Sequence, residues 1–153
     1  MSNRSIEVRP AAYDEVFQIR DTIVGARVLS EMPLPEVEEP WAIQYTLDLI
    51  KRGFVWVAVT DRTVVGVAIV DQLHWHWNRG AFFLENSHFW VLPKHRKGGT
   101  AIRLLKCMKD RAKELGLPLS IRITHSDGAV DTKDRFMKMQ GLKQVGGTFW
   151  FQG

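Results

Sequence analysis

A basic turn with paired glycines, placed between an apolar run and a long amphipathic stretch, is the part of the sequence best suited to chemistry. Phe89 to Leu92 is an aromatic and β-branched run of strand length, and Pro93 cannot continue a sheet ladder. From Thr100 the apolar residues recur at helical spacing. The turn between them carries four potentially cationic side chains and two glycines: Lys94, His95, Arg96, Lys97, Gly98 and Gly99. Because a helix N-terminus has unpaired N–H groups and a partial positive charge, we expect a phosphate or pyrophosphate there.

The same turn resembles a motif of a known enzyme family. Arg96-Lys97-Gly98-Gly99-Thr100-Ala101 fits the R/Q-x-x-G-x-G/A signature of the GCN5-related N-acetyltransferases, and Val91-Leu92-Pro93 lies where that family often has V-x-P. The resemblance implies acetyl-CoA as the cofactor, with its pantetheine along the backbone of Trp90 and Val91. It also implies that the pyrophosphate is held by Arg96, Lys97, Gly98, Gly99, Thr100 and Ala101. The alternative interpretation is an ordinary strand–turn–helix connection with solvated charges.

Acetyl transfer to an amine requires a neutral nucleophile, and an amine with a pKa near 10 is protonated at neutral pH, so a base is expected. Glu85 lies eleven residues before Arg96, and in this offset it resembles the catalytic glutamate of the histone-acetyltransferase branch of the family. His88 is the second candidate, because imidazole titrates near neutral pH. Strand alternation predicts that Glu85 and His88 lie on opposite faces of the strand. The alternatives are a solvated glutamate at the start of the strand and a packed histidine.

Two positions depart from the family pattern. Many relatives have a tyrosine four residues before the glycine that follows the last helix, and this chain has Met137 there, before Gly141. Val130 occupies the position of an asparagine that is often found earlier in that helix. A thioether has no proton to give to the departing thiolate. The proton could come from Ser126 or water, the thiolate could leave unassisted, or the domain could bind acyl-CoA without catalysis.

Length and composition predict one globular domain over residues 1–153, with 45% hydrophobic and 25% charged residues. The net charge is +4, and the basic residues concentrate between Lys94 and Lys113, which a polyanionic cofactor explains with fewer assumptions than a nucleic acid. Cys107 is the single cysteine, so no intrachain disulfide can form. The sequence has no apolar N-terminal segment and no apolar run of membrane-spanning length. We therefore expect a cytoplasmic protein without a membrane partner.

Hydrophobic periodicity predicts an α+β fold of order βααβββαβαβ, a central mixed sheet with helices on both faces, which is the order expected of the acetyltransferase family. The predicted strands are 6–9, 54–60, 64–70, a strand that follows Phe82 and ends at Leu92, 119–124 and 144–151. The predicted helices are 11–24, 41–51, 100–115 and 130–140. Residues 71–80 are interpreted as a linker, and 125–128 as a turn. The segment FMKMQGLKQVG near the C-terminus also resembles the F-Y-x-x-x-G-F-x-x-x-G motif with which sequences of this family often end.

Two further clusters concern partners. The segment His74-Trp75-His76-Trp77 has two histidines on one face of a strand. Two ligands do not complete a metal site, so we predict no metal. The preferred interpretation of this segment is an aromatic hairpin tip over the acceptor groove or a homodimer contact. The acidic group Glu36, Glu38 and Glu39 either attracts a cationic amine or is a solvated loop. The acceptor is predicted to be a small-molecule amine or an amine of a protein or peptide.

The predicted function is therefore an acetyl-CoA-dependent N-acetyltransferase. We expect direct attack in a ternary complex, because Cys107 lies within a predicted helix and is badly placed to carry an acyl group. The alternatives are a non-catalytic acyl-CoA-binding module and a domain that binds nucleic acid or a protein partner through the basic helix.

Overall fold

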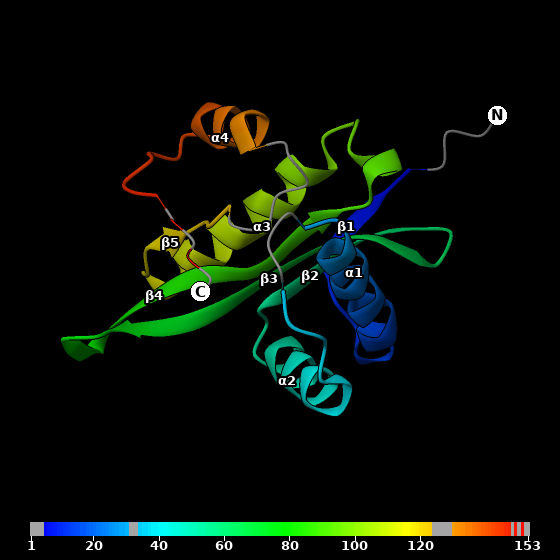
Figure 1. The fold of residues 1–153 in the computed structure, drawn as a ribbon, viewed down its shortest axis with the longest axis horizontal. Coiled ribbons are helices and arrows are strands. Elements are labelled where there is room, and N and C mark those ends of the chain that lie inside the picture. The colour runs from blue at the N-terminus through cyan, green and yellow to red at the C-terminus, as the bar shows by residue number, and fades with distance from the viewer. Residues whose placement is uncertain (1–4, 31–33, 124–129, 148, 150, 152–153) are drawn as a thin grey trace.

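One mixed, five-stranded sheet organises the chain in the computed structural model, which describes residues 5–30, 34–123, 130–147, 149 and 151 (Figure 1). The strands are β1 (Glu7–Pro10), β2 (Val55–Thr60), β3 (Thr63–Trp75), β4 (Asn78–Val91) and β5 (Leu119–Ser120). They lie side by side in this order, β1 to β4 antiparallel and β5 parallel to β4. The predicted α+β class with a mixed sheet is confirmed.

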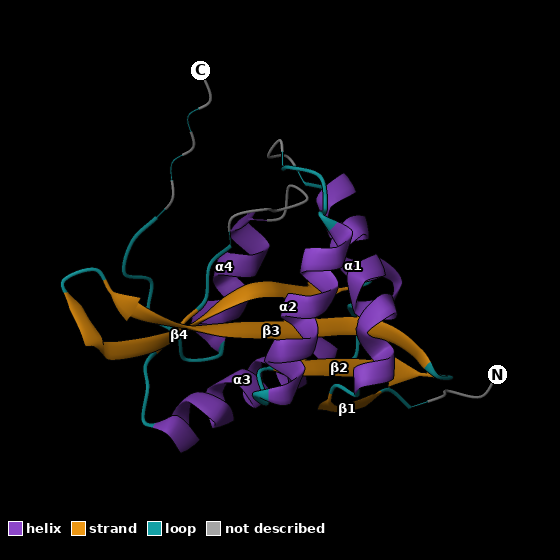
Figure 2. Cartoon of the chain, turned by 90° about the horizontal axis from the view of Figure 1, so that it is seen from below, coloured by secondary structure: helices purple, strands orange, loops and turns teal. Residues whose placement is uncertain are grey.

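Helices cover both faces of the sheet, as predicted. The 3-10 turn η1 (Tyr13–Glu15) leads into α1 (Val16–Val28), and α1 and α2 (Glu39–Lys51) lie on one face. The helices α3 (Thr100–Leu115) and α4 (Val130–Met139) lie on the other, and a 3-10 turn η2 (Pro93–His95) joins β4 to the loop before α3. Seen from below, α1 and α2 pass in front of the strands (Figure 2). None of the helices in the described ranges combines the length and apolar character that crossing a membrane requires.

The central strands are buried from both sides, which explains why β2 and β3 read as continuous apolar runs rather than as alternating ones. Val57, Val67 and Val70 are fully buried. Ile19 of α1 and Leu49 of α2 are buried on one side, and α3 contributes Leu104, Leu105 and Met108 on the other. Close approach of α3 depends on Gly66 of β3, because a Cβ there would lie 3.2 Å from Leu104 Cδ1. This packing fixes the position of the N-terminus of α3.

Residues 71–80 are not a linker, and this prediction was wrong. β3 continues to Trp75 and β4 begins at Asn78, so the two strands form a long arm that projects beyond the helices (Figure 2). Aromatic contacts support the pairing, with ring centroids 5.3 Å apart for Trp75 and Trp77 and 4.7 Å apart for Trp75 and Phe83. The segment around His76 is the tip of this hairpin.

The end of the chain also differs from the prediction. Residues 144–147, 149 and 151 are not in a strand, and Val145, Phe149 and Phe151 are highly exposed. Gly146 and Gly147 interrupt the alternation with residues that have no side chain to pack. Of the predicted strand 119–124, Leu119–Ser120 form β5, whereas residues 121–123 are not in a strand. The predicted turn at 125–128, with Ser126, lies outside the described residues.

Candidate active site

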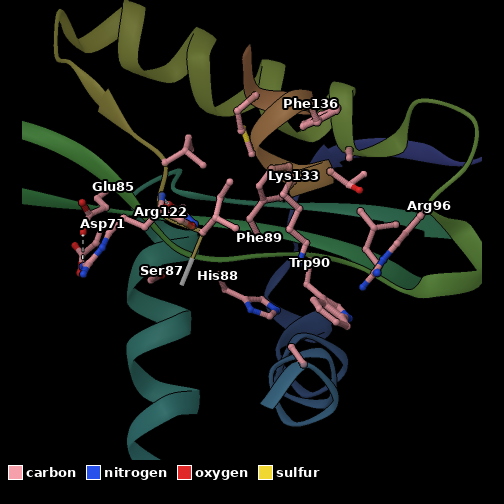
Figure 3. A pocket seen from close by; sticks show the side chains of 18 of the residues that line it. Asp71, Glu85, Ser87, His88, Phe89, Trp90, Arg96, Arg122, Lys133 and Phe136 are labelled. Atoms are coloured by element: carbon pink, nitrogen blue, oxygen red, sulfur yellow. Dashed lines mark hydrogen bonds and ion pairs between the residues drawn. The ribbon is translucent and has the colours of Figure 1, made fainter. Parts of the chain in front are cut away.

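A cavity of about 520 Å³ lies where β5 separates from β4 (Figure 3). The two strands pair at two positions, Leu84 with Leu119 and Glu85 with Ser120. Beyond these positions the cavity wall is formed by β4, by residues 121–123 after β5, by α4 and by the start of α3, with smaller contributions from β3 and α1. Its apolar members include Phe89, Val91, Ala101, Ile121, Ile123, Phe136 and Met137, and its polar members include Asp71, Glu85, His88, Arg96, Arg122 and Lys133.

Asn86 bridges the two strands at the point where they separate. Its Oδ1 accepts a hydrogen bond from Arg122 N at 2.7 Å, and its Nδ2 donates to Arg122 O at 3.2 Å. The side-chain amide therefore takes both backbone groups that a further ladder position would have used. This contact also explains why the predicted strand 119–124 ends at Ser120.

A β-bulge at Ser87 changes which side chains of β4 share a face. Ile69 pairs with His88, and Val70 pairs with Asn86, so Ser87 is the extra residue. Because directly opposed residues point to the same side of a sheet, Glu85 shares a face with Asp71, and His88 shares the same face with Ile69. The prediction that Glu85 and His88 lie on opposite faces was wrong, because regular alternation fails at the bulge.

Glu85 is held by two donors. Ser120 Oγ donates to Glu85 Oε2 at 3.0 Å, and Arg122 Nη1 lies 3.1 Å from Glu85 Oε1. Asp71 lies directly opposite on β3, with Arg52 Nη1 at 4.0 Å. Burial raises the pKa of the Asp71 carboxyl above its ordinary value, and the hydrogen bond from the Gln72 N–H opposes this shift. Two carboxylates thus lie at one end of the cavity (Figure 3).

His88 is positioned by helix α1. Thr22 Oγ1 lies 3.1 Å from His88 Nε2, and the same hydroxyl donates to Ile19 O at 2.6 Å. Thr22 is buried, whereas His88 lies in the cavity wall. The structure therefore brings both base candidates, Glu85 and His88, to one face of β4 and into one cavity.

The predicted phosphate loop lies at the opposite end of the cavity from the two carboxylates (Figure 3). Gly98 and Gly99 have positive φ of 93° and 82°, and Gly99 is the N-cap of α3. A Cβ on either glycine would meet no atom within 4 Å, so the loop backbone is open on the side where a ligand could approach. Thr100 Oγ1 is buried at the first turn of α3, with no hydrogen-bond partner among the described residues. An anion fits this helix start, because the donors of the first turn have no intrahelical acceptor.

Arg96 is anchored to the strand before the loop. Its Nε donates to Val91 O at 2.8 Å, and its guanidinium lies over the Trp90 ring, 4.5 Å from the centroid. Lys133 of α4 approaches the same ring at 5.9 Å. Trp90 is buried, so its indole ties the loop and α4 to β4.

Four of the predicted cofactor residues line the cavity, namely Trp90, Val91, Arg96 and Ala101. The other four, Lys97, Gly98, Gly99 and Thr100, form the loop and helix start next to Arg96. Sequence reasoning did not identify Thr22, Asp71, Asn86, Arg122 and Lys133. No local pattern marks these residues, since their roles depend on strand register and on the docking of α1 and α4.

The other predicted clusters lie elsewhere. Glu36, Glu38 and Glu39 are exposed and are not in the cavity wall, and Glu39 forms an ion pair with Arg20 of α1. His74 and His76 are on the arm. In the described part of the chain, no three His, Cys, Asp or Glu side chains are grouped in a way that could hold a metal ion. Met137 does line the cavity.

The chain belongs to the acetyltransferase (GNAT) family, whose family model matches residues 19–137. The match includes most of α1, all of α2, the strands β2 to β5, the loop before α3, α3 itself and most of α4. A comparison with curated proteins finds no match. Membership therefore follows from the family model, and the fold agrees with it.

Solved structures share the fold over almost the whole chain. The aminoglycoside N-acetyltransferase AAC(6')-Iy in complex with CoA is 14% identical, with a TM-score of 0.72 and coverage of 99% of this chain and 96% of that chain. A predicted acetyltransferase from Clostridium acetobutylicum with acetyl-CoA is 12% identical, with a TM-score of 0.69 and coverage of 97% and 96%. A ribosomal-protein-alanine N-acetyltransferase from Brucella melitensis biovar Abortus 2308 is 14% identical, with a TM-score of 0.68 and coverage of 97% and 98%. At these identities the likeness concerns the fold.

Proposed function

We propose that the protein transfers an acetyl group from acetyl-CoA to a primary amine by direct attack in a ternary complex. One observation carries the proposal: a single cavity has the start of α3 with Arg96 at one end and the carboxylates Asp71 and Glu85 at the other. A polyanionic thioester and a cationic amine need opposite electrostatic environments. Family membership and the solved complexes with acetyl-CoA or CoA agree with this assignment.

The loop residues are proposed to bind the cosubstrate. The amides of Gly98, Gly99, Thr100 and Ala101, with the positive charges of Arg96 and Lys97, would hold the pyrophosphate at the start of α3. Pantetheine would lie along β4 at Trp90 and Val91, where the strand faces the cavity. The thioester that the cosubstrate supplies is an activated acyl group, so the protein has to orient it and accept a proton.

Direct attack is supported by the environment of the sole cysteine. Cys107 is half-buried in α3 and is not in the cavity wall, and burial raises the pKa of its thiol above the ordinary value. A thiol with a raised pKa is a poor nucleophile at neutral pH. A single cysteine also suits the reducing, cytoplasmic environment that we propose.

The acceptor is proposed to be a small-molecule or peptide amine that enters at the carboxylate end. Glu85, the base predicted from the sequence, is one of two candidates for accepting its proton, and His88 is the other. The structural neighbours include an aminoglycoside N-acetyltransferase and a ribosomal-protein-alanine N-acetyltransferase. Enzymes with this fold are therefore named for small-molecule acceptors and for protein acceptors.

A non-catalytic acyl-CoA-binding module is the second candidate, and Met137 favours it. This residue lines the cavity and cannot donate a proton. Release of free CoA thiol in the presence of an amine panel distinguishes the two functions, since a binding module releases none.

Calorimetric titration of acetyl-CoA into the wild type, Gly99→Glu and Gly99→Ala tests the cosubstrate site. Gly99→Glu adds a negative charge at the helix start and should abolish binding. Gly99→Ala has the same unfavourable φ of 82° but adds no charge, so it should lose about 1–2 kcal/mol of stability while it still binds. No binding to the wild type would reject the proposed function.

A further inference from the structure

We propose that His88 accepts the proton of the acceptor amine through Nδ1, and that Thr22 is the positioning residue that makes Nδ1 the basic nitrogen. This inference rests on the proposed acetyl transfer, and it assigns the base within the same cavity. Glu85 is then left to bind the acceptor rather than to deprotonate it.

The hydroxyl of Thr22 determines the tautomer of His88. A threonine hydroxyl has one proton, and Thr22 Oγ1 uses it to donate to Ile19 O at 2.6 Å. Towards His88 the same oxygen can therefore act as an acceptor, and His88 Nε2, 3.1 Å away, must carry the proton. In the neutral ring the lone pair is then on Nδ1. Because Thr22 is buried in α1, this orientation does not depend on a mobile surface group.

The bulge at Ser87 places the imidazole on the acceptor side of β4. His88 shares a face with Glu85 and Asp71, and all three line the cavity. The two oxygens of Glu85 already accept hydrogen bonds from Arg122 and Ser120. Both oxygens of this carboxylate are therefore already engaged by hydrogen-bond donors.

The charged groups around His88 come from several elements. Those that share the cavity are Asp71 on β3, Glu85 on β4, Arg96 before α3, Arg122 after β5 and Lys133 on α4; on α1, next to Thr22, Asp21 is paired with Arg20. Carboxylates and cations therefore both surround this ring. A base that must be neutral to act gives the rate profile an acidic limb, and we assign that limb to His88.

The amine reacts in its neutral form, after the cation has released one proton to solvent. Its nitrogen forms a C–N bond to the thioester carbonyl carbon and gives a further proton to His88 Nδ1, which becomes imidazolium. The C–S bond breaks, its electron pair leaves with the thiolate, and the imidazolium returns the proton to the thiolate directly or through water. The products are the acetylated amine, CoA thiol and neutral His88. This route also supplies the proton that Met137 cannot give.

The first test needs neither cosubstrate nor acceptor. Nitrogen-15 NMR of imidazole-labelled protein, with His88→Gln to assign the signal, reports which ring nitrogen carries the proton above the titration range. We expect the Nε2–H tautomer in the wild type and in Thr22→Ser, and a mixture in Thr22→Val, which lacks the acceptor. A wild-type Nδ1–H tautomer would overturn the inference.

The second test is the pH dependence of kcat/KM for thiol release, with acetyl-CoA and an amine that the panel identifies. His88→Gln retains an amide donor for Thr22 but no base, so the rate at neutral pH should fall roughly 100-fold or more and the acidic limb should disappear. Thr22→Val should lie between the wild type and His88→Gln, and Thr22→Ser should restore the wild-type profile. Acetyl-CoA affinity should be unchanged in all three.

Two results separate failure of the inference from failure of the proposed function. Normal rates and a normal limb in His88→Gln, with loss of the limb in Glu85→Gln, would assign the base to Glu85 and overturn the inference while acetyl transfer stands. A wild type that neither binds acetyl-CoA nor releases thiol would overturn the proposed function and the catalytic role of His88 with it. The tautomer measurement would still decide whether Thr22 orients the ring.

Discussion

Replacement of Asn86 should destabilise the protein and weaken acetyl-CoA binding together. Asn86→Ala removes two hydrogen bonds to the backbone of Arg122, one short at 2.7 Å and one long at 3.2 Å. Each bond of this kind contributes roughly 0.5–1.5 kcal/mol, and both are solvent-accessible, so we expect a loss of about 1–2 kcal/mol in the free energy of unfolding. Because the segment after β5 would lose its attachment to β4 at the mouth of the cavity, the cavity wall should become less ordered and cosubstrate affinity should fall.

Asn86→Asp gives a sharper test, because it replaces only the side-chain NH2 group with an oxygen and its effect on stability depends on pH. The carboxylate can still accept from Arg122 N, but it repels Arg122 O, so at neutral pH the loss should exceed that of Asn86→Ala. Protonation restores a donor to the carbonyl, so the folded-state pKa of this aspartate should lie above its unfolded value of about 3.9. Stability should therefore recover as the pH falls through the folded-state pKa and be lost again as it rises.

Urea unfolding at several pH values and acetyl-CoA calorimetry measure both effects. Asn78→Ala is the matched control, since Asn78 Oδ1 accepts a local hydrogen bond from Gly80 N on the arm, away from the cavity. We expect it to leave acetyl-CoA affinity unchanged. Wild-type stability and affinity in Asn86→Ala would refute the bridging role, and so would an equal loss of affinity in the control.

Three further predictions follow from burial, charge and the cavity wall. Leu104→Ala should lower the free energy of unfolding by about 2–5 kcal/mol, because Leu104 is fully buried. Ile102→Ala, on the exposed side of α3, should lower the free energy of unfolding far less. Urea unfolding measures both changes. Asp71→Asn should raise Tm at pH 7, because burial raises the pKa of Asp71 and its carboxylate is therefore destabilising at that pH. The difference in Tm between the variant and the wild type should vanish as the pH falls below the ordinary aspartate pKa. A lower calorimetric Tm of the variant at pH 7 would contradict this prediction. Met137→Tyr should speed thiol release, because a phenol can protonate the departing thiolate, and an unchanged rate would argue against proton donation from that position.

Elements with strong local signals were predictable from the sequence. The helix at Thr100–Leu115 has the predicted bounds, because its apolar period begins after a glycine pair and ends at Gly116, which has the positive φ of 65° that glycine tolerates. The loop before this helix was recognised because paired glycines and cationic residues directly precede the helix start. Local spacing sufficed here, because the anion-binding character of a helix start depends on nearby residues.

Features that depend on cross-strand register were not predictable. Nothing in the sequence around Ser87 marks a bulge, and without it His88 is assigned to the wrong face. Asp71 was placed in a linker, since its partner Glu85 is defined by strand pairing. Thr22 lies in a helix whose contact with β4 is a matter of tertiary packing.

The bulge also limits how residue roles can be transferred between relatives by counting along the chain. Trp90 and Glu85 are five positions apart, an odd separation that places two side chains on opposite faces of a regular strand, yet here both point to the same face. A relative with the same spacing but no extra residue would present its glutamate to the other side of the sheet. A single insertion or deletion in β4 could therefore exchange the residues that meet the acceptor while the phosphate loop stays intact. Sequence alignments of this strand need the bulge as an anchor as much as the glycine motif.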